Sequence, residues 1–218
     1  MDKTPLTKIS HYCFDLDGTL VDSNKTIYNS TIYTLTKLGI EHKIDEQEFE
    51  GKIGQHFVDI FTAFNIIVPD FDEFLKIYKQ NYLQQMDCSK LYSGVKEVLG
   101  ELKNRGAKIS LLTTKAQDQT DKILDYFDLK KYFDLAMGRR DGIAHKPSPE
   151  PLLMICKELN ADVNNTVMIG DTELDIRCGK NAGTFTCGVL YGYRTKELIE
   201  IENPDFIVDR IEQVLAIH

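Results

Sequence analysis

The chain has 218 residues, of which 42% are hydrophobic and 28% are charged, and its formal net charge is −8. This composition is ordinary for a globular protein, and the negative charge argues against a general affinity for nucleic acid or for an anionic membrane surface. No apolar run approaches the ~20 residues that cross a bilayer, and residues 1–5 lack the apolar stretch of a signal peptide. The length allows one domain or two.

Five cysteines are scattered along the chain, and none of them forms a CxxC spacing. The sequence therefore does not indicate a zinc knuckle or a dithiol redox motif. Cys13 and Cys187 lie in apolar runs that are typical of strands, where a free thiol usually acts as a small hydrophobic side chain. We expect a protein of the reducing cytoplasm.

The first predicted element is a short buried strand over residues 12–14, followed directly by Asp-Leu-Asp-Gly-Thr at 15–19. If the chain is still extended there, the side chains of Asp15 and Asp17 leave the same face of the strand. Two carboxylates at the end of a buried strand are costly unless a metal or a phosphoryl group uses them. Gly18 permits a sharp turn because it has no side-chain clash at positive φ.

Residues 22–86 contain three helical patterns and no convincing strand. Their apolar stripes are Tyr28, Ile32, Leu35 and Leu38 before Gly39; Ile53, Phe57, Ile60, Phe61 and Phe64; and Phe71, Phe74, Leu75, Tyr78 and Tyr82 after Asp70. Aromatic residues at this spacing are more typical of the core of a small helical bundle than of a cofactor site. We expect an all-helical cap domain over residues 21–86, and a second domain formed by residues 1–20 and 87–218.

From residue 89 onward, short apolar runs alternate with helical patterns. Ser93 is the expected N-cap of a helix that ends at Gly106. The elements expected after it are a strand at 107–113, a helix at 116–127, a strand at 133–137, a helix beginning at Pro149 and Pro151, a strand at 166–170, a helix at 173–182 and a strand at 184–190. This alternation predicts an α/β fold in which helices cover both faces of a parallel sheet.

Four polar segments fall at predicted strand ends or in loops, where an α/β fold places its active site. They are residues 15–19, 113–115, 145–147 and 170–175. Each segment alone has a plain structural interpretation, such as a turn, a local threonine hydrogen bond, a surface lysine or a helix cap. Their occurrence together, each at such a position, favours a catalytic site.

These segments resemble the core motifs of the haloacid dehalogenase superfamily, in the branch that has a helical cap after the first strand. The matching residues are Asp15, Asp17, Thr113, Lys146, Asp171 and Asp175. The resemblance covers nearly the whole chain, and residues 15–23, 146–151 and 170–175 are most similar to phosphoglycolate phosphatases. It implies a Rossmann-like core with a cap domain, and a magnesium-dependent phosphatase acting on a small phosphorylated metabolite.

The resemblance also implies a two-step hydrolysis. Asp15 would attack phosphorus and form an aspartyl-phosphate. Asp17 would protonate the leaving oxygen and then take a proton from the attacking water. Mg²⁺ would bind the Asp15 carboxylate, the backbone carbonyl of Asp17 and the Asp171 carboxylate, which are the hard oxygen ligands that suit this ion.

Three further residues receive supporting roles from the resemblance. Thr113 would donate a hydrogen bond to a phosphoryl oxygen, and Lys146 would neutralise charge on Asp15 and on the transferring group. Asp175 is expected to support the metal-bound waters or Lys146 rather than to bind the metal directly.

The chain offers further candidates around the phosphate. Gly18 and the Thr114 amide are candidates for backbone contacts to phosphate. Lys115 is a candidate for a contact to a substrate anion, although an exposed lysine is an equal interpretation. Residues 20–23 would form the segment that lets the cap open and close.

Recognition of the rest of the substrate is expected from the cap, because the core motifs handle only the phosphoryl group. Segment 50–56 is the candidate, since it could point Lys52, Gln55 and His56 into the site. A simple connection between two cap helices is the alternative.

Other functions on the same scaffold remain to be compared. A halide-removing enzyme characteristically lacks the second acid of the first motif, so Asp17 argues against it. A β-phosphoglucomutase-type phosphotransferase typically has a fourth motif unlike residues 170–175. A non-catalytic sensor of phosphorylated ligands would be expected to lose a motif residue. The phosphoester stays open among phosphoglycolate, a nucleoside monophosphate, a sugar phosphate and pyrophosphate, and so does the choice between a monomer and a homodimer.

Overall fold

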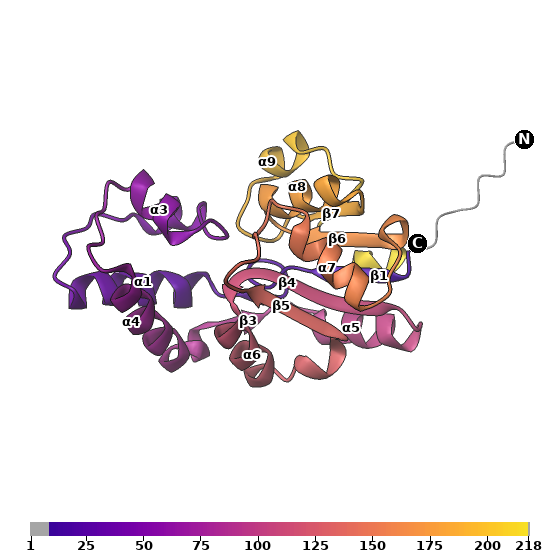
Figure 1. Cartoon of the computed structure of the whole chain (residues 1–218), viewed down its shortest axis with the longest axis horizontal. Coiled ribbons are helices and arrows are strands. Elements are labelled where there is room, and N and C mark those ends of the chain that lie inside the picture. Colours follow the sequence, from indigo (N-terminus) through magenta and orange to yellow (C-terminus); the bar gives the residue numbers. More distant parts are fainter. Residues whose placement is uncertain (1–8, 218) are drawn as a thin grey trace, which may run out of the picture. The chain divides into compact units, whose positions relative to one another are not determined.

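The computed structural model describes residues 9–217, which form two compact units (Figure 1). The first unit contains the residues up to Leu20 and those from Leu91 onward, and the second contains Val21–Lys90. No helix in the described range is both long enough and apolar enough to cross a membrane.

The first unit is built on a six-stranded sheet in the order β5-β4-β1-β6-β7-β8, in which each strand runs parallel to its neighbours. The strands are β1 (His11–Phe14), β4 (Lys108–Ala116), β5 (Leu135–Arg139), β6 (Thr166–Gly170), β7 (Phe185–Val189) and β8 (Phe206–Val208). Every residue of β1 and β6 is buried, as expected of parallel strands that are covered on both faces. The predicted α/β fold is confirmed.

The helices of this unit lie on both faces of the sheet (Figure 1). They are α5 (Val95–Asn104), α6 (Gln117–Tyr126), α7 (Glu150–Glu158), α8 (Glu173–Ala182) and α9 (Lys196–Ile201). After β1 the chain adds β4 and β5 on one side of it, and then β6, β7 and β8 on the other. Because such crossovers are right-handed, this change of direction places α5 and α6 on one face and α7 and α8 on the other. The carboxyl ends of β4, β1 and β6 therefore meet at a topological switch point, where α/β folds bind their ligands.

The core beneath α7 and α8 explains most of the cysteines. Its buried cluster is Cys13, Leu112, Met137, Leu152, Ile155, Cys156, Met168 and Cys178. The five cysteines are all free thiols, and only Cys88 is exposed. The interpretation of Cys13 and Cys187 as small hydrophobic side chains is confirmed.

The second unit is a small helical bundle with an aromatic core. Its helices are α1 (Asn24–Lys37), α2 (Glu46–Glu50), α3 (Phe57–Ala63), α4 (Phe71–Gln84) and the 3-10 turn η1 (Met86–Cys88). The ring centroids of Phe61 and Phe74 lie 5.0 Å apart, and those of Phe57 and Tyr78 lie 4.7 Å apart. The prediction that these aromatic stripes form a bundle core is confirmed.

Several local predictions were wrong. The second helical pattern of this unit is helical only over α3, because Ile53 lies in the turn before it, and the short helix α2 was not predicted. Two short strands, β2 (Val21–Asp22) and β3 (Lys90–Leu91), pair with each other, although no strand was expected beside the helical insert. Two-residue strands carry no periodicity from which to predict them.

Helix α1 buries a different face from the one predicted. Its buried residues are Thr26, Ile27, Ser30, Thr31, Thr34 and Leu35, whereas Tyr28 and Ile32 are only half-buried. The hydroxyls of Thr31 and Thr34 donate to the carbonyls four residues earlier, at 2.8 and 2.7 Å. These hydrogen bonds allow threonines to occupy a buried stripe that a hydrophobic pattern does not mark.

The N-cap of α5 is Gly94 and not Ser93. Gly94 has φ of 85°, a conformation that favours glycine. A Cβ at this position would come within 2.7 Å of Glu212 Oε1. Glu212 belongs to the 3-10 helix η4 (Ile211–Ala216), which was not predicted.

His11 links the three central strands. It is fully buried on β1, with Nε2 2.7 Å from Ser110 Oγ on β4 and Nδ1 3.1 Å from Thr166 Oγ1 on β6. Burial, together with the charge of Lys108, lowers the pKa of His11 from 6.5 to about 4. The folded protein therefore holds this imidazole neutral where the unfolded chain would protonate it.

We predict that His11 makes the fold sensitive to acid. The unfolded chain binds one more proton between pH 6.5 and pH 4, so this contribution to stability is complete above pH 7 and falls as the pH drops through that window. The loss is about 3 kcal/mol. Urea unfolding between pH 7 and pH 4 measures it, and His11→Gln should flatten the pH dependence. The exposed His145→Gln is the control and should leave the slope unchanged.

An NMR titration of wild-type His11 tests the same attribution without a variant. An imidazole that titrates near pH 6.5 in the folded protein would contradict it. So would a His11→Gln protein that keeps the full slope.

Candidate active site

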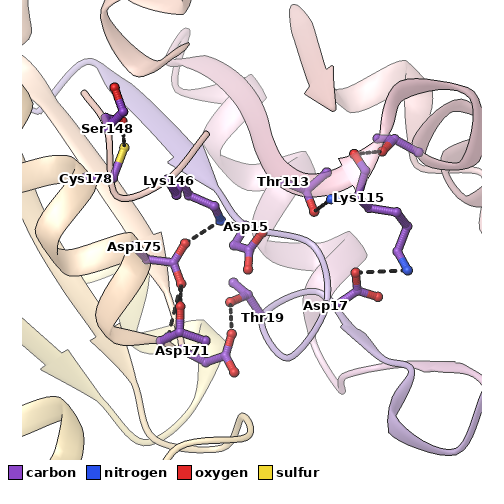
Figure 2. A network of polar contacts seen from close by, with 12 residues as sticks. Asp15, Asp17, Thr19, Thr113, Lys115, Lys146, Ser148, Asp171, Asp175 and Cys178 are labelled. Carbon is purple, nitrogen blue, oxygen red and sulfur yellow. Dashed lines mark hydrogen bonds and ion pairs between the residues drawn. The ribbon is translucent and has the colours of Figure 1, made fainter. Parts of the chain in front are cut away.

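The predicted core residues converge at the carboxyl ends of β1, β4 and β6 (Figure 2). Asp15 directly follows β1, and its amide donates to the Ile169 carbonyl of β6 at 2.9 Å. The chain bends at Leu16, so the extended conformation considered for Asp15 to Asp17 does not reach Asp17. Asp171 directly follows β6, and Thr113 lies in the carboxyl half of β4. Lys146 comes from the segment that precedes α7.

Lys146 is a buried ammonium between two carboxylates. Its Nζ lies 2.8 Å from Asp15 Oδ1 and 2.5 Å from Asp175 Oδ1. Burial lowers the pKa of Lys146, but the charges of Asp15 and Asp175 more than offset this effect, and the pKa is raised overall. Lys146 therefore stays positively charged. The interpretation of Lys146 as a solvated surface lysine is wrong, because only 3% of the residue is exposed.

Asp175 in the first turn of α8 fixes the position of Lys146. Its Oδ2 accepts from the Thr172 amide at 3.1 Å and from the Thr172 hydroxyl at 2.7 Å, while Oδ1 faces Lys146. A Cβ on Gly170 would lie 2.1 Å from the Asp175 carboxyl carbon, so this close approach requires glycine. Because both oxygens of Asp175 already have hydrogen-bond partners, this residue fits the predicted role of supporting Lys146.

Asp171 is fully buried, and both of its oxygens are hydrogen-bonded. Oδ1 accepts from the Thr19 hydroxyl at 3.2 Å, and Oδ2 accepts from the Tyr193 amide at 2.9 Å. A Cβ on Gly18 or on Gly192 would lie 2.2 Å from an atom of Asp171. Burial, together with the charge of Asp175, raises the pKa of Asp171 to about 7.

The three buried carboxylates form a group that could hold a metal ion. Asp15, Asp171 and Asp175 each offer an oxygen atom, and these atoms lie within 4.8 Å of one another. Burial raises the pKa of Asp15 well above its ordinary value, the neighbouring carboxylates add to this effect, and Lys146 opposes it. Since the carboxylates outnumber the single ammonium, a further cation would offset their repulsion. Hard carboxylate oxygens fit Mg²⁺.

The Asp17 side chain lies apart from this group and faces Lys115. Its Oδ2 is 3.3 Å from Lys115 Nζ, and the side chains of Asp17 and Lys115 are 12% and 7% exposed (Figure 2). The alternative of an exposed Lys115 is therefore wrong. Its predicted contact with a substrate anion stays a prediction.

Thr113 is buried beside this pair. Its Oγ1 accepts from the Lys115 amide at 3.2 Å. This is the local hydrogen bond that a strand-end threonine commonly makes, and it uses the oxygen as an acceptor. The hydroxyl proton can therefore still be donated. Thr114, next along β4, is half-buried.

The candidate substrate-binding residues Lys52, Gln55 and His56 make local contacts within the second unit. His56 is the N-cap of α3, where Nδ1 accepts from the Val58 amide at 3.3 Å, and its ring stacks on Phe71 at 6.0 Å. Lys52 Nζ lies 6.0 Å from the centroid of the Phe64 ring, and the Lys52 carbonyl accepts from the Gln55 amide. These contacts define a folded turn, and the role of the turn toward substrate stays a prediction.

Sequence reasoning missed the residues that surround Asp171. Residues 191–194 contact Asp171 or its neighbours, yet they lie outside the four polar segments selected on chemistry alone. Thr19 lies inside the first segment, but its contact with Asp171 was not predicted. A signal was present, because residues 191–194 follow β7, the next strand of the same sheet. The rule that directed attention to residues 15–19 and 170–175 applies equally to them.

A separate cavity of about 320 Å³ lies in the first unit. It is lined by Tyr92, Ser93, Tyr191, Asp209, Arg210, Ile211 and Glu212. Its size is within the range of small-molecule sites. None of the buried carboxylates or Lys146 lines it, so we assign the chemistry to the charged group and not to this cavity.

Comparison with known proteins decides the family. The sequence profile of the haloacid dehalogenase-like hydrolases matches residues 12–189. The chain belongs to this family. The resemblance drawn from the four motifs is thus confirmed, and the protein is a phosphatase of the haloacid dehalogenase type.

Relatives of this haloacid dehalogenase-like chain carry two kinds of name. A pyrophosphatase PpaX of Bacillus mycoides is 32% identical over 211 residues, which are 96% of this chain and 97% of the relative. The solved structure of a predicted phosphoglycolate phosphatase from Haemophilus somnus is 28% identical, with a TM-score of 0.84 over 97% of this chain and 99% of its own. A predicted phosphatase from Clostridium acetobutylicum is 27% identical, with a TM-score of 0.83 over 95% and 96%.

We predict that the folded state of this hydrolase depends on the charge of Lys146. Lys146→Met leaves Asp15 and Asp175 buried without their cation, which should lower the free energy of unfolding by about 3–5 kcal/mol. Urea unfolding in the presence of a chelator measures the change. Lys122→Met, at an exposed position of α6, should change it by less than about 0.5 kcal/mol. Equal stability of the two variants would contradict the prediction.

Proposed function

We propose that the protein is a magnesium-dependent phosphatase that hydrolyses a small phosphorylated metabolite through an aspartyl-phosphate on Asp15. The observation that carries the proposal is the buried contact of Asp15 with Lys146 inside the group of carboxylates at the switch point. A carboxylate alone would repel a phosphate dianion. With Lys146 and a metal ion beside it, the same carboxylate can act as a nucleophile.

The metal would be held by the carboxylates of Asp15 and Asp171 and by the backbone carbonyl of Asp17. When bound, it would neutralise phosphoryl oxygens and orient the phosphate for in-line attack. The hydrogen bonds from Thr19 and Tyr193 hold the Asp171 carboxylate in a fixed orientation for this role. Asp175 instead holds Lys146.

Two displacements then complete the reaction. In the first, an Asp15 oxygen attacks phosphorus, the bond from phosphorus to the leaving oxygen breaks, and Asp17 gives its proton to that oxygen. In the second, water attacks phosphorus, the bond to Asp15 breaks, and Asp17 takes the proton from the water. Lys115, 3.3 Å from Asp17, would hold this carboxylate in place or contact a substrate anion.

The backbone and hydroxyl groups around Asp15 would bind the phosphate. We assign this role to the Thr113 hydroxyl, the Thr114 amide and Gly18. Hydrogen-bond donors fixed by the fold stabilise the charge on a transferring phosphoryl group without reorganising during the reaction.

We propose that residues 21–86 act as a cap domain on a core formed by residues 1–20 and 87–218, and that residues 20–23 permit its movement. Lys52, Gln55 and His56 in the turn between α2 and α3 would read the part of the substrate beyond the phosphate. We place the protein in the cytoplasm, which its free thiols support.

The motif similarity favours phosphoglycolate or a similar small phosphomonoester as the substrate. Inorganic pyrophosphate is the second candidate, because relatives named pyrophosphatase PpaX match 96% of this chain at about the same identity as the solved phosphatases. Both compounds present a phosphoryl group joined to a second small anion. The cap turn would therefore meet negative charge in either case.

We predict that substrate phosphorylates Asp15. Mass spectrometry of acid-quenched wild-type protein should locate one phosphoryl group on this residue, and a chelator should abolish turnover. Asp15→Asn should lose both the label and all measurable hydrolysis, because an amide cannot act as this nucleophile. The exposed Asp125→Asn should retain both. A label on another residue, or full activity in Asp15→Asn, would refute the mechanism.

We predict that the cap turn sets the choice among substrates. Phosphoglycolate, pyrophosphate, nucleoside monophosphates and sugar phosphates are compared by kcat/KM with magnesium. Lys52→Met should lower kcat/KM most for substrates with a second anion, by roughly tenfold, because it removes a positive charge. His56→Asn keeps an N-cap acceptor for α3 and so tests the ring alone.

Lys43→Met, at an exposed position of the same unit, is the matched control for Lys52→Met. If Lys52→Met and His56→Asn leave the relative kcat/KM values unchanged across the panel, as the control should, the turn does not select the substrate. Phosphate transfer to a sugar instead of to water would favour the mutase alternative.

A further inference from the structure

Residues 191–194, which begin two residues after β7, contact Asp171 and the residues next to it. They lie beyond the residues 12–189 that match the family. Nothing in the reaction as proposed uses their side chains. Their contacts nevertheless converge on Asp171 and on the segments that hold it.

Both oxygens of Asp171 depend on this segment. The Tyr193 amide donates to Oδ2 at 2.9 Å. The Tyr191 hydroxyl donates to the Thr19 carbonyl at 3.0 Å, and the Thr19 hydroxyl donates to Asp171 Oδ1 at 3.2 Å. The approach is close, because a Cβ on Gly192 would lie 2.2 Å from Asp171 Cβ.

Arg194 connects residues 191–194 to Glu173, which follows β6. Its Nε lies 2.7 Å from Glu173 Oε2, and its Nη2 lies 3.3 Å from Glu173 Oε1. The side chain of Arg194 is 2% exposed and that of Glu173 is 21% exposed. Two parallel hydrogen bonds between a guanidinium and a carboxylate fix an orientation as well as a distance. Because Glu173 is two residues from Asp171, the pair fixes the segment next to that carboxylate.

The third nitrogen of the guanidinium adds to the argument. Arg194 Nη1 is buried, and no hydrogen-bond partner for it exists among residues 9–217. A buried donor without a partner is costly, so a contact that serves stability alone would be expected to avoid it. The cost of this unpaired donor is understandable if the fixed guanidinium serves to orient the segment that contacts Asp171.

We propose that Arg194 is a positioning residue for the Asp171 carboxylate. It acts through Glu173, which holds residues 191–193 against Asp171, and so it sets the affinity of the site for Mg²⁺. This inference rests on the proposed role of Asp171 as a metal ligand. Outer residues that orient a ligand commonly change metal affinity by about 10- to 100-fold when they are replaced.

A second arginine–glutamate pair, between Arg177 of α8 and Glu202 at the end of α9, provides a matched control. Arg177 Nε lies 3.0 Å from Glu202 Oε2, and Arg177 Nη2 lies 2.5 Å from Glu202 Oε1. This pair has the same two-bond geometry, but the Arg177 side chain is 52% exposed and neither residue contacts Asp171 in any described hydrogen bond. Its loss reports what an arginine–glutamate pair contributes to stability alone.

The test is titration of the metal-free full chain with MgCl₂ by calorimetry. Arg194→Met and Glu173→Gln should each raise the Kd for Mg²⁺ about tenfold or more. The Kd of the double variant should not exceed that of the single variant that binds Mg²⁺ more weakly, because both changes break the same contact. The control variant Arg177→Met should leave the Kd for Mg²⁺ unchanged. At saturating Mg²⁺, the kcat of Arg194→Met should return close to that of the wild type.

The outcomes separate this inference from the proposed function. If the wild type binds Mg²⁺ and Asp171→Asn does not, but Arg194→Met and Glu173→Gln bind like the wild type, the positioning role is refuted and the metal site stands. If the wild type does not bind Mg²⁺, both are overturned. Glu173→Gln keeps the shape of the side chain, so it decides the matter if Arg194→Met fails to fold.

Discussion

The site depends on one electrostatic constraint, which is the burial of more carboxylates than cations at the ends of β1 and β6. One carboxylate oxygen from each of Asp15, Asp171 and Asp175 lies within 4.8 Å of the others, and the Lys146 ammonium contacts Asp15 and Asp175. Removing charges from water is costly, so each carboxylate must gain donors or a partner ion. The surrounding residues supply the hydrogen bonds and the ammonium that offset this cost. The proposed metal and phosphate chemistry relies on the same buried charges.

Close approach is the second requirement, and glycines provide it. Gly170 admits the Asp175 carboxyl, while Gly18 and Gly192 admit Asp171 from two sides. At Gly18 the backbone also has φ of 84°, which other residues rarely adopt. The charged groups could not gather at this density if these positions carried even a methyl group, so the glycines belong to the site as much as the charged residues do.

The sequence allowed the parallel sheet and the convergence of Asp15, Thr113, Lys146 and Asp171 to be predicted. The reason is that apolar strands are local patterns and that their carboxyl ends meet by topology. The buried threonines of α1 escaped prediction, because hydrogen bonds to the preceding turn let polar side chains occupy a buried face. The cap of α5 at Gly94 escaped prediction, because a glycine with positive φ begins this helix without a side-chain cap. The hydrogen bond of Tyr193 to Asp171 spans 22 residues, and no local pattern reports such a pairing.

The position of Asp175 joins helix formation to the charged site. Its Oδ2 binds the amide and hydroxyl of Thr172 at the start of α8, and its Oδ1 binds Lys146. The positive end of the α8 macrodipole thus faces the carboxylates. The first turn of α8 therefore belongs to the site as much as the strand ends do, because the geometry that begins the helix also places the carboxylate that holds Lys146.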